Sequence, residues 1–236
     1  TVVTGRVERG IVKVGDKVEI VGIMNGYDGL INGNFREMSP DEFSGILTVG
    51  GTILGTKRTP FKKMRVVEED KVDKVAAMKK NYRAAKLDCL LCLGGNGTHK
   101  TANLLSQEGL NIIGLPKTID NDLFGTDHCP GYASAAKYIA TSIMEVYQDA
   151  HVYDKGMIVV VEIMGRHAGW LAAASALASE YGAGPDLIYL PETDFSMPKF
   201  IEDVKKVYNA TGNCIVAVSE GIHYEDGGFV SEAKVA

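Results

Sequence analysis

The chain has little of several features that mark whole classes of protein. Its 236 residues include only 4 cysteines, 7 prolines and 1 tryptophan, and its formal net charge is −5. So few cysteines argue against a disulfide-stapled scaffold. The acidic balance argues against a general binder of nucleic acid or membrane surfaces. No apolar run approaches the roughly 18 residues of a membrane span, and no charged-then-apolar leader opens the chain. We therefore expect a soluble, cytoplasmic protein without nucleic-acid or membrane partners.

Two of the cysteines, Cys89 and Cys92, have the C-x-x-C spacing of a redox or zinc pair. Both lie in an apolar run that is typical of a buried strand, where positions i and i+3 face opposite sides. No second pair accompanies them. The sequence favours structural thiols over a redox or zinc site.

The hydrophobic fraction of 45% indicates a globular chain that can bury a sizeable core, and the 27 glycines are typical of α/β folds whose backbone approaches phosphates closely. Residues 61–86 are rich in lysine and arginine, which we interpret as one helix with a solvated face. After residue 62 the pattern alternates between helix and strand. Helices are predicted around 72–82 and over 98–107, 132–149, 171–181 and 196–208, with Ser196 as an N-cap. Strands are predicted over 88–93, 111–115, 157–163, 187–190 and 213–219.

Repeated βα units predict an α/β fold with a largely parallel sheet and helices on both faces. Residues 157–163 are so continuously apolar that we expect a strand buried on both faces. Ligands then bind beyond the carboxyl ends of the strands. The first 22 residues differ: short alternating runs at 1–7, 11–14 and 17–21 predict an antiparallel β-hairpin.

Five motifs carry candidate chemistry. Residues 94–98 read GGNGT between a predicted strand and helix, so their backbone N–H groups can approach an anion; a plain tight turn is the alternative. Residues 116–122 read PKTIDND after the next strand, where close carboxylates can divide proton transfer and Mg²⁺ binding; an Asp-rich turn is the alternative. The remaining three are EIMGRHAG at 162–169, SEG at 219–221 and GGTILGTKR at 50–58. For His167 alone we favour a solvent-exposed role.

Together and in this order, with GTDH-x-PGY at 125–132, these motifs resemble the phosphofructokinase family over residues 23–236. The resemblance implies two facing Rossmann-like α/β domains, here at 23–130 and 131–236. It implies a glycolytic kinase that transfers a phosphoryl group from ATP or pyrophosphate to the 1-hydroxyl of fructose 6-phosphate, with Mg²⁺. It also implies a homo-oligomer.

The resemblance assigns roles to individual residues. Asp120 is the expected general base, assisted by Thr118 and Lys117, and Asp122 and Asn96 lie near the metal. The expected fructose 6-phosphate contacts are Thr118, Asp120, Asp122, Met164, Gly165, Arg166 and Glu220. The expected phosphoryl-donor contacts are Gly51, Arg58, Gly94, Gly95, Asn96, Gly97 and Thr98.

The donor signature is mixed. Asn96 stands where ATP-dependent members have an aspartate, and Lys117 resembles the pyrophosphate-dependent type. Gly97 resembles ATP users, and we give it more weight because a side chain there would clash with a nucleotide.

Both ends depart from the family pattern. Residues 1–22 instead resemble the start of the second domain of elongation factor Tu, and the chain ends before the family's LGH-x-QRGG segment. We therefore expect a chimera or fragment that binds the sugar phosphate detectably and ATP poorly. Two alternatives stay open: a catalytically dead sugar-phosphate-binding protein, and a translation-factor module defined by residues 1–22.

Overall fold

The computed structural model describes residues 18–68 and 71–233, which divide into two compact units. Unit 1 comprises the described residues up to Leu90 together with Lys100–Ile113, and unit 2 comprises Leu91–His99 and the described residues from Gly114 onward. The predicted hairpin runs at 1–7 and 11–14 lie outside the described residues. The predicted domain boundary at residue 130 stays a prediction.

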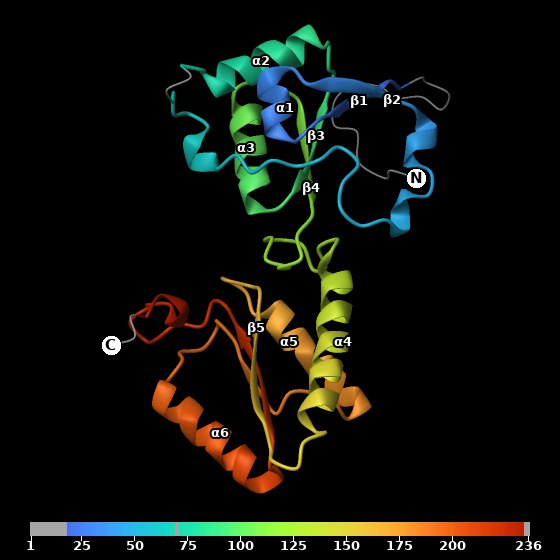
Figure 1. Cartoon of the computed structure of the whole chain (residues 1–236). Helices are drawn as coiled ribbons and strands as arrows, with labels where there is room; N and C mark the ends of the chain where they lie inside the picture. Colours follow the sequence, from blue (N-terminus) through green and yellow to red (C-terminus); the bar gives the residue numbers. More distant parts are fainter. Residues whose placement is uncertain (1–17, 69–70, 234–236) are drawn as a thin grey trace. The chain divides into compact units, whose positions relative to one another are not determined.

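Unit 1 begins with a short antiparallel pair of strands, and one helix lies between them in sequence (Figure 1). Strand β1 (Ile20–Ile23) pairs with β2 (Phe35–Met38), and α1 (Tyr27–Asn32) lies between them in sequence. The chain turns at Asn25 and Gly26, which both have positive φ. The predicted run at 17–21 therefore does continue into a strand, but its partner β2 and the helix α1 were not predicted.

The basic stretch 61–86 does not form the single predicted helix. It contains a 3-10 turn at Phe61–Lys63 and the separate helix α2 (Lys74–Ala84), which follow two further 3-10 turns at Pro40–Phe43 and Ile46–Thr48. Asp73 caps α2 by accepting a hydrogen bond from the Ala76 N–H, and this cap sets the start of the helix. Val75, Met78 and Tyr82 are buried, as their spacing predicts.

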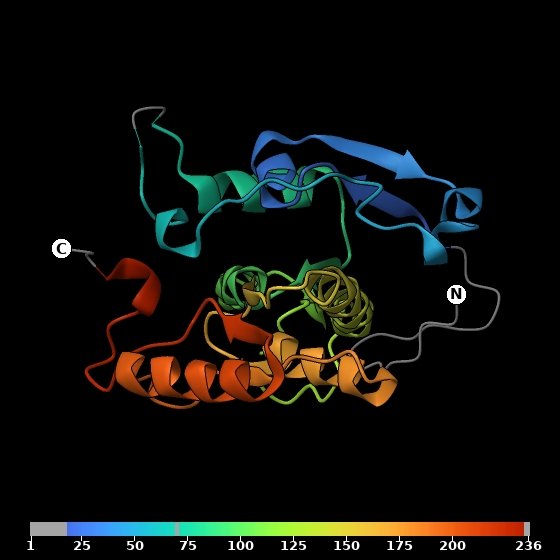
Figure 2. The ribbon, with the colours of Figure 1, turned by 60° about the horizontal axis from the view of Figure 1, so that its bottom comes forward.

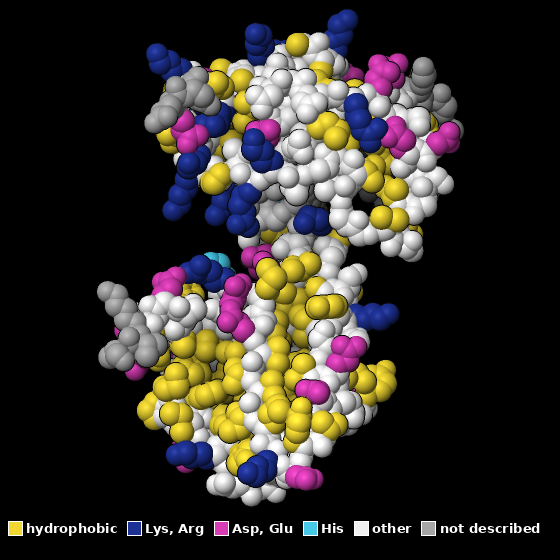
Figure 3. Space-filling model, viewed as in Figure 1, with side chains coloured by type: hydrophobic (Ala, Val, Ile, Leu, Met, Phe, Trp, Pro, Cys, Tyr) yellow, Lys and Arg dark blue, Asp and Glu magenta, His cyan; other side chains and the backbone are white. Residues whose placement is uncertain are grey.

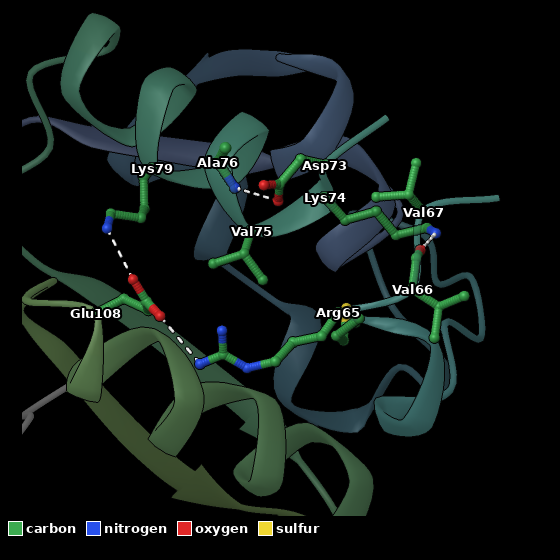
Figure 4. Close-up of a pocket in the computed structure, with 10 residues that line it drawn as sticks. Arg65, Val66, Val67, Asp73, Lys74, Val75, Ala76, Lys79 and Glu108 are labelled. Atoms are coloured by element: carbon green, nitrogen blue, oxygen red, sulfur yellow. Dashed lines mark hydrogen bonds and ion pairs between the residues drawn. The ribbon is translucent and has the colours of Figure 1, made fainter. Parts of the chain in front are cut away.

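Acidic side chains pair with the basic residues of this region. Arg65 Nη2 and Lys79 Nζ donate to the two carboxylate oxygens of Glu108 at 3.0 and 2.8 Å (Figure 4). Lys74 Nζ donates to the Val66 carbonyl and to Glu68, both at 3.0 Å. Arg65, Lys74, Lys79 and Glu108 line a hollow of about 250 Å³. Its apolar walls are Met64, Val66, Val67 and Val75. That this stretch binds no nucleic acid stays a prediction.

Strands β3 (Leu90–Gly94) and β4 (Ile112–Pro116) form a two-stranded sheet, with α3 (Asn96–Gln107) between them in sequence. The helix begins two residues earlier than predicted, so Asn96 and Gly97 belong to its first turn.

The larger sheet of unit 2 is fully parallel. Its strands β5 (Ile158–Ile163), β6 (Leu187–Tyr189) and β7 (Cys214–Ser219) have the order β5-β7-β6. The helices are α4 (Tyr132–Ala150), α5 (Trp170–Ala174) with a 3-10 continuation at Ser175–Tyr181, and α6 (Met197–Thr211). Ser196 caps α6 as predicted, and a last 3-10 turn spans Val230–Glu232. The parallel α/β prediction is confirmed.

Helices cover both faces of this sheet, α4 and α5 on one and α6 on the other (Figures 1 and 2). On the first face Leu171 of α5 packs against Ile163 and Ala217, and on the second Val204 of α6 packs against Cys214 and Val216.

One prediction about this sheet is wrong: β5 is not buried on both faces. Ile158 and Val160 are 51% and 50% exposed. They are in register with Cys214 and Val216 of β7, which α6 covers. Because α6 packs over β7 and β6 only, the same face of the edge strand β5 stays open, and hydrophobic side chains gather on this side of the unit (Figure 3).

All four cysteines are free thiols; Cys92, Cys129 and Cys214 are buried and Cys89 is half-buried. Within residues 18–68 and 71–233, no group of three or more His, Cys, Asp or Glu side chains is placed to hold a metal ion by itself. The preference for structural thiols over a zinc pair stays a prediction. No helix in the described ranges is long and apolar enough to cross a membrane.

Candidate functional site

Two of the predicted motifs meet because the strands before them are parallel neighbours. Ile163 at the end of β5 is in register with Ser219 at the end of β7. Residues 164–166 and Glu220 therefore leave the sheet at the same edge, where ligands of such sheets bind.

The two segments are joined by hydrogen bonds. The Gly165 N–H donates to Glu220 Oε1 at 3.1 Å. The buried Ser219 hydroxyl donates to the Gly165 carbonyl at 2.6 Å and accepts from the Gly221 N–H at 3.2 Å. Gly165 has φ +125°, and a Cβ there would lie 2.5 Å from the Ala168 carbonyl oxygen, so only glycine fits.

The far end of this loop has an anchor that the sequence analysis missed. Glu192 Oε1 accepts a hydrogen bond from the Gly169 N–H at 2.7 Å. Glu220 and Glu192 thus hold two backbone N–H groups, one at each end of residues 165–169. Glu192 belongs to none of the predicted motifs. The only signal in the sequence that could have indicated its role as an anchor is its position shortly after strand β6.

Arg166 lies in this loop and contacts two further residues. Its Nη2 donates to Glu232 Oε1 at 2.7 Å, and its Cζ lies 4.4 Å from the centroid of the Phe229 ring. Neither Phe229 nor Glu232 was predicted. His167 is exposed, as we expected, and its ring is 6.4 Å from that of Phe229.

The loop after β4 is shaped by an asparagine that the motif also contains. Asn121 is buried with φ +53°; its Nδ2 donates to the Asp127 carbonyl at 3.1 Å and its Oδ1 accepts from the Cys129 N–H at 2.8 Å. Its neighbours Asp120 and Asp122 are held in place by this internal bracing. Thr118 Oγ1 accepts from the Asp120 N–H at 3.3 Å.

The pKa of Asp120 is shifted by its surroundings. Burial raises its pKa above the usual aspartate value, and the negative charges of Asp122 and Glu220 raise it further. His167 and Lys117 act in the opposite direction. Asp120 therefore interacts electrostatically with Lys117 and Asp122 of its own loop, with His167 after β5 and with Glu220 after β7.

The GGNGT turn adjoins the loop of Asp120. The Lys117 N–H donates to the Gly94 carbonyl at 2.9 Å, and Asn96 Nδ2 donates to Asp122 Oδ2 at 2.9 Å. A Cβ on Gly94 would lie 2.3 Å from Thr98 Oγ1, so a residue with a side chain at position 94 would crowd Thr98. At Gly97 a Cβ would meet no atom within 4 Å.

Two of the predicted donor contacts, Gly51 and Arg58, are exposed residues of unit 1. Their loop is tied to the β1–α1 turn through the Asn25 N–H, which donates to the Leu54 carbonyl at 2.9 Å. Their role stays a prediction.

Comparisons with known proteins agree with this arrangement. The phosphofructokinase family model matches residues 3–235. The chain is 44% identical over 208 residues to an ATP-dependent 6-phosphofructokinase of Spirochaeta thermophila, covering 86% of this chain and 55% of the relative. It is 38% identical over 221 residues to a pyrophosphate–fructose 6-phosphate 1-phosphotransferase of Rhodospirillum rubrum, covering 89% and 52%.

A solved structure supports the same relationship. The pyrophosphate-dependent phosphofructokinase of Nitrosospira multiformis superposes with a TM-score of 0.76 at 30% identity, covering 92% of this chain and 55% of that one. The chain thus spans about half the length of the relatives it matches. The likeness of residues 1–22 to elongation factor Tu, and with it a chimeric chain, stays a prediction. A family model that matches nearly every residue, together with the shared fold, shows that the chain belongs to the phosphofructokinase family.

Proposed function

We propose that this chain carries the phosphoryl-transfer site of a 6-phosphofructokinase, with fructose 6-phosphate as acceptor and ATP as donor. The observation that carries the proposal is the cluster of Asp120, Asp122 and Glu220 at the ends of two strands, β4 and β7, beside a glycine turn that opens a helix. Phosphoryl transfer needs positioning and charge neutralisation more than covalent help from the protein, and this cluster offers both.

Asp120 acts as the general base. Burial and two neighbouring carboxylates raise its pKa, and a raised pKa makes the carboxylate a better proton acceptor. As the sugar 1-hydroxyl oxygen bonds to the γ-phosphorus of ATP, the bond from that phosphorus to the β-phosphate oxygen breaks. The hydroxyl proton passes to Asp120, and ADP leaves. Lys117 supplies positive charge beside the reacting groups.

Asp122 and Asn96 fit a magnesium site. They are in contact, and together they offer carboxylate and amide oxygens, the donor types that Mg²⁺ takes alongside water and substrate phosphates. When bound, Mg²⁺ neutralises charge on the donor phosphates. Asp122 would supply a carboxylate oxygen and Asn96 its amide oxygen to the metal.

The open space at Gly97 favours ATP as donor. No atom lies within 4 Å of a Cβ built there, so the first turn of α3 leaves room for a nucleotide phosphate. Pyrophosphate is the alternative donor, since relatives of both kinds are similar to this chain.

Fructose 6-phosphate is held by the loop at 164–166 and by Glu220. Glu220 accepts from the Gly165 N–H with one oxygen and can accept from a sugar hydroxyl with the other. Arg166 offers a planar fork of N–H donors that suits a phosphate group. We also propose a cytoplasmic homo-oligomer; four free thiols fit a reducing compartment, and sedimentation tests the assembly.

The test combines calorimetric titration with a coupled kinase assay on the full chain. Fructose 6-phosphate should bind, and Arg166→Ala should weaken it about a hundredfold, since a hydrogen bond to a charged group is worth about 1.5–3 kcal/mol. Lys205→Ala, which removes a positive charge from α6, is the matched control. Binding without any phosphoryl transfer would favour the catalytically dead alternative, and absence of sugar-phosphate binding would overturn the proposal.

A further inference from the structure

The Arg166 guanidinium is already engaged by a short segment near the end of the described chain. Its Nη2 donates to Glu232 at 2.7 Å, and Phe229 lies under its Cζ at 4.4 Å. Both contacts come from residues more than sixty positions away in sequence. They therefore depend on how the chain returns after β7.

The return is fixed by backbone hydrogen bonds rather than by the two side chains. His223 and Phe229 form an antiparallel bridge, the Val230 N–H donates to the Ile222 carbonyl at 3.1 Å, and the Tyr224 N–H donates to the Gly228 carbonyl at 3.0 Å. Phe229 is thus delivered to the loop of Arg166 by a small hairpin, and the Val230–Glu232 turn follows directly.

The two contacts use different parts of the guanidinium. The Phe229 ring covers its face, an arrangement that attracts a cation and limits its rotation while leaving the N–H edges accessible. Glu232 occupies one of those edges. Arg166 and Glu232 are 52% and 65% exposed, and an ion pair so open to water contributes little net stability. Its carboxylate is therefore easy to exchange for another anion.

We propose that Phe229 is a positioning residue that orients the Arg166 guanidinium, and that the Glu232 carboxylate competes with a ligand phosphate for the same N–H edge of that guanidinium. A phosphate-bearing ligand then binds by displacing Glu232. The apparent affinity for the phosphate-bearing ligand is lowered because only the molecules in which Arg166 is not paired with Glu232 can bind it. This inference rests on the proposed function, because it assumes that Arg166 is the phosphate contact.

Opposite effects at the two positions distinguish this role from a structural one. Glu232→Gln removes the competing charge and should tighten ligand binding about two- to fivefold, the range for an exposed ion pair. Phe229→Leu removes the platform and should weaken binding several-fold, whereas Phe229→Tyr, which keeps an aromatic face, should restore it. A segment that only supported the fold would weaken binding in both variants.

The experiment titrates the full chain with inorganic phosphate and, separately, with fructose 6-phosphate. The readouts are calorimetry and the NMR signal of the Arg166 Nε–H. Glu225→Gln, which removes the same charge from the same segment without a contact to Arg166, is the control and should leave both affinities unchanged. In an Arg166→Ala background, Glu232→Gln should lose its effect.

The outcomes separate the two ideas. If Glu232→Gln leaves phosphate affinity unchanged or lowers it, or if Arg166→Ala binds phosphate as well as the parent chain does, the inference is overturned. If phosphate behaves as expected but fructose 6-phosphate binds to no variant, the positioning role stands and the proposed function fails.

Discussion

Replacing Ser219 by alanine isolates the hydrogen bonds that join the two halves of the proposed sugar-phosphate site. Ser219 is 1% exposed, and its hydroxyl serves the Gly165 carbonyl and the Gly221 N–H at 2.6 and 3.2 Å. Alanine has nearly the same shape, so no cavity opens. Both backbone groups nevertheless lose this partner inside the protein.

The expected cost follows from counting those groups. A buried polar group left without a partner costs about 1–3 kcal/mol, so Ser219→Ala should destabilise unit 2 by about 2–4 kcal/mol. For a chain of this size that corresponds to a fall of roughly 5–15 °C in the unfolding midpoint. Because Gly165 precedes Arg166, affinity for fructose 6-phosphate should fall as well.

Ser175→Ala is the matched control. Ser175 is 0% exposed, and its hydroxyl also donates to a carbonyl, that of Ala172 at 2.5 Å. That carbonyl keeps the backbone N–H of residue 175 as a second donor, so no group is orphaned. We expect a loss of about 0–1 kcal/mol and unchanged ligand affinity.

Trp170, the single tryptophan, lies in unit 2 and reports the transition by its fluorescence during urea unfolding. Equal losses for Ser219→Ala and Ser175→Ala would show that the hydroxyl bridge does not hold the loop. If Ser219→Ala is destabilised but binds the sugar phosphate as the parent chain does, the hydroxyl's two hydrogen bonds contribute to stability and not to ligand binding.

Three further predictions concern other parts of the chain. Asp120→Asn should abolish phosphoryl transfer yet preserve or raise stability at pH 7, because burial and neighbouring carboxylates disfavour its charge; a kinase assay and urea unfolding test this. Hydrogen bonds from Lys79 and, to a smaller extent, Arg65 hold the pKa of Glu108 below its usual range. The stability that Glu108 contributes to the folded state is therefore present above its unfolded-state pKa and is lost as the pH falls through its lowered folded-state pKa. Hydrogen exchange in α2 should show Glu108→Gln as less stable at neutral pH and equal to the parent in strong acid. Gly165→Ala should lower the thermal unfolding midpoint and the ligand affinity far more than Gly182→Ala does. At Gly182 an alanine meets no neighbouring atom and adds only the backbone strain of φ +70°, about 1 kcal/mol.

The elements that the sequence predicted well are those with long periodic patterns and clear caps. Helices α2, α4 and α6 and the strands of the parallel sheet fall within a few residues of their predicted ranges. The β1–β2 pair was missed because its strands are four residues each and their partner relation crosses a helix. Such short strands carry too little alternation to be recognised.

Exposure was harder to predict than secondary structure. The run at 157–163 is apolar enough for a strand covered on both sides, yet Ile158 and Val160 face outward. The hydrophobicity of a strand indicates only that its side chains can be buried. Whether the side chains of β5 are in fact buried depends on α6, which covers β7 and β6. The position of α6 is a tertiary property, which no local pattern encodes.

The candidate site shows the same division. Asp120, Arg166 and Glu220 were predicted because each follows an apolar strand within a recognisable motif. Their supports were not, since Glu192 and Glu232 reach the loop at 165–169 from distant parts of the chain. The residues proposed to contact substrate lie in recognisable motifs, whereas the residues that support them are identified only by their contacts in the structure.

The parallel register of β5 and β7 links these two levels. Ile163 lies opposite Ser219, and the next residues along each strand carry Arg166 and Glu220. Val161 and Ile163 face the core formed by α4 and α5, whereas Glu162 faces outward. A slip of one residue would turn Glu162 into that core and carry Gly165 away from Ser219 and Glu220. The packing that fixes the fold therefore also fixes the distances on which the proposed chemistry depends.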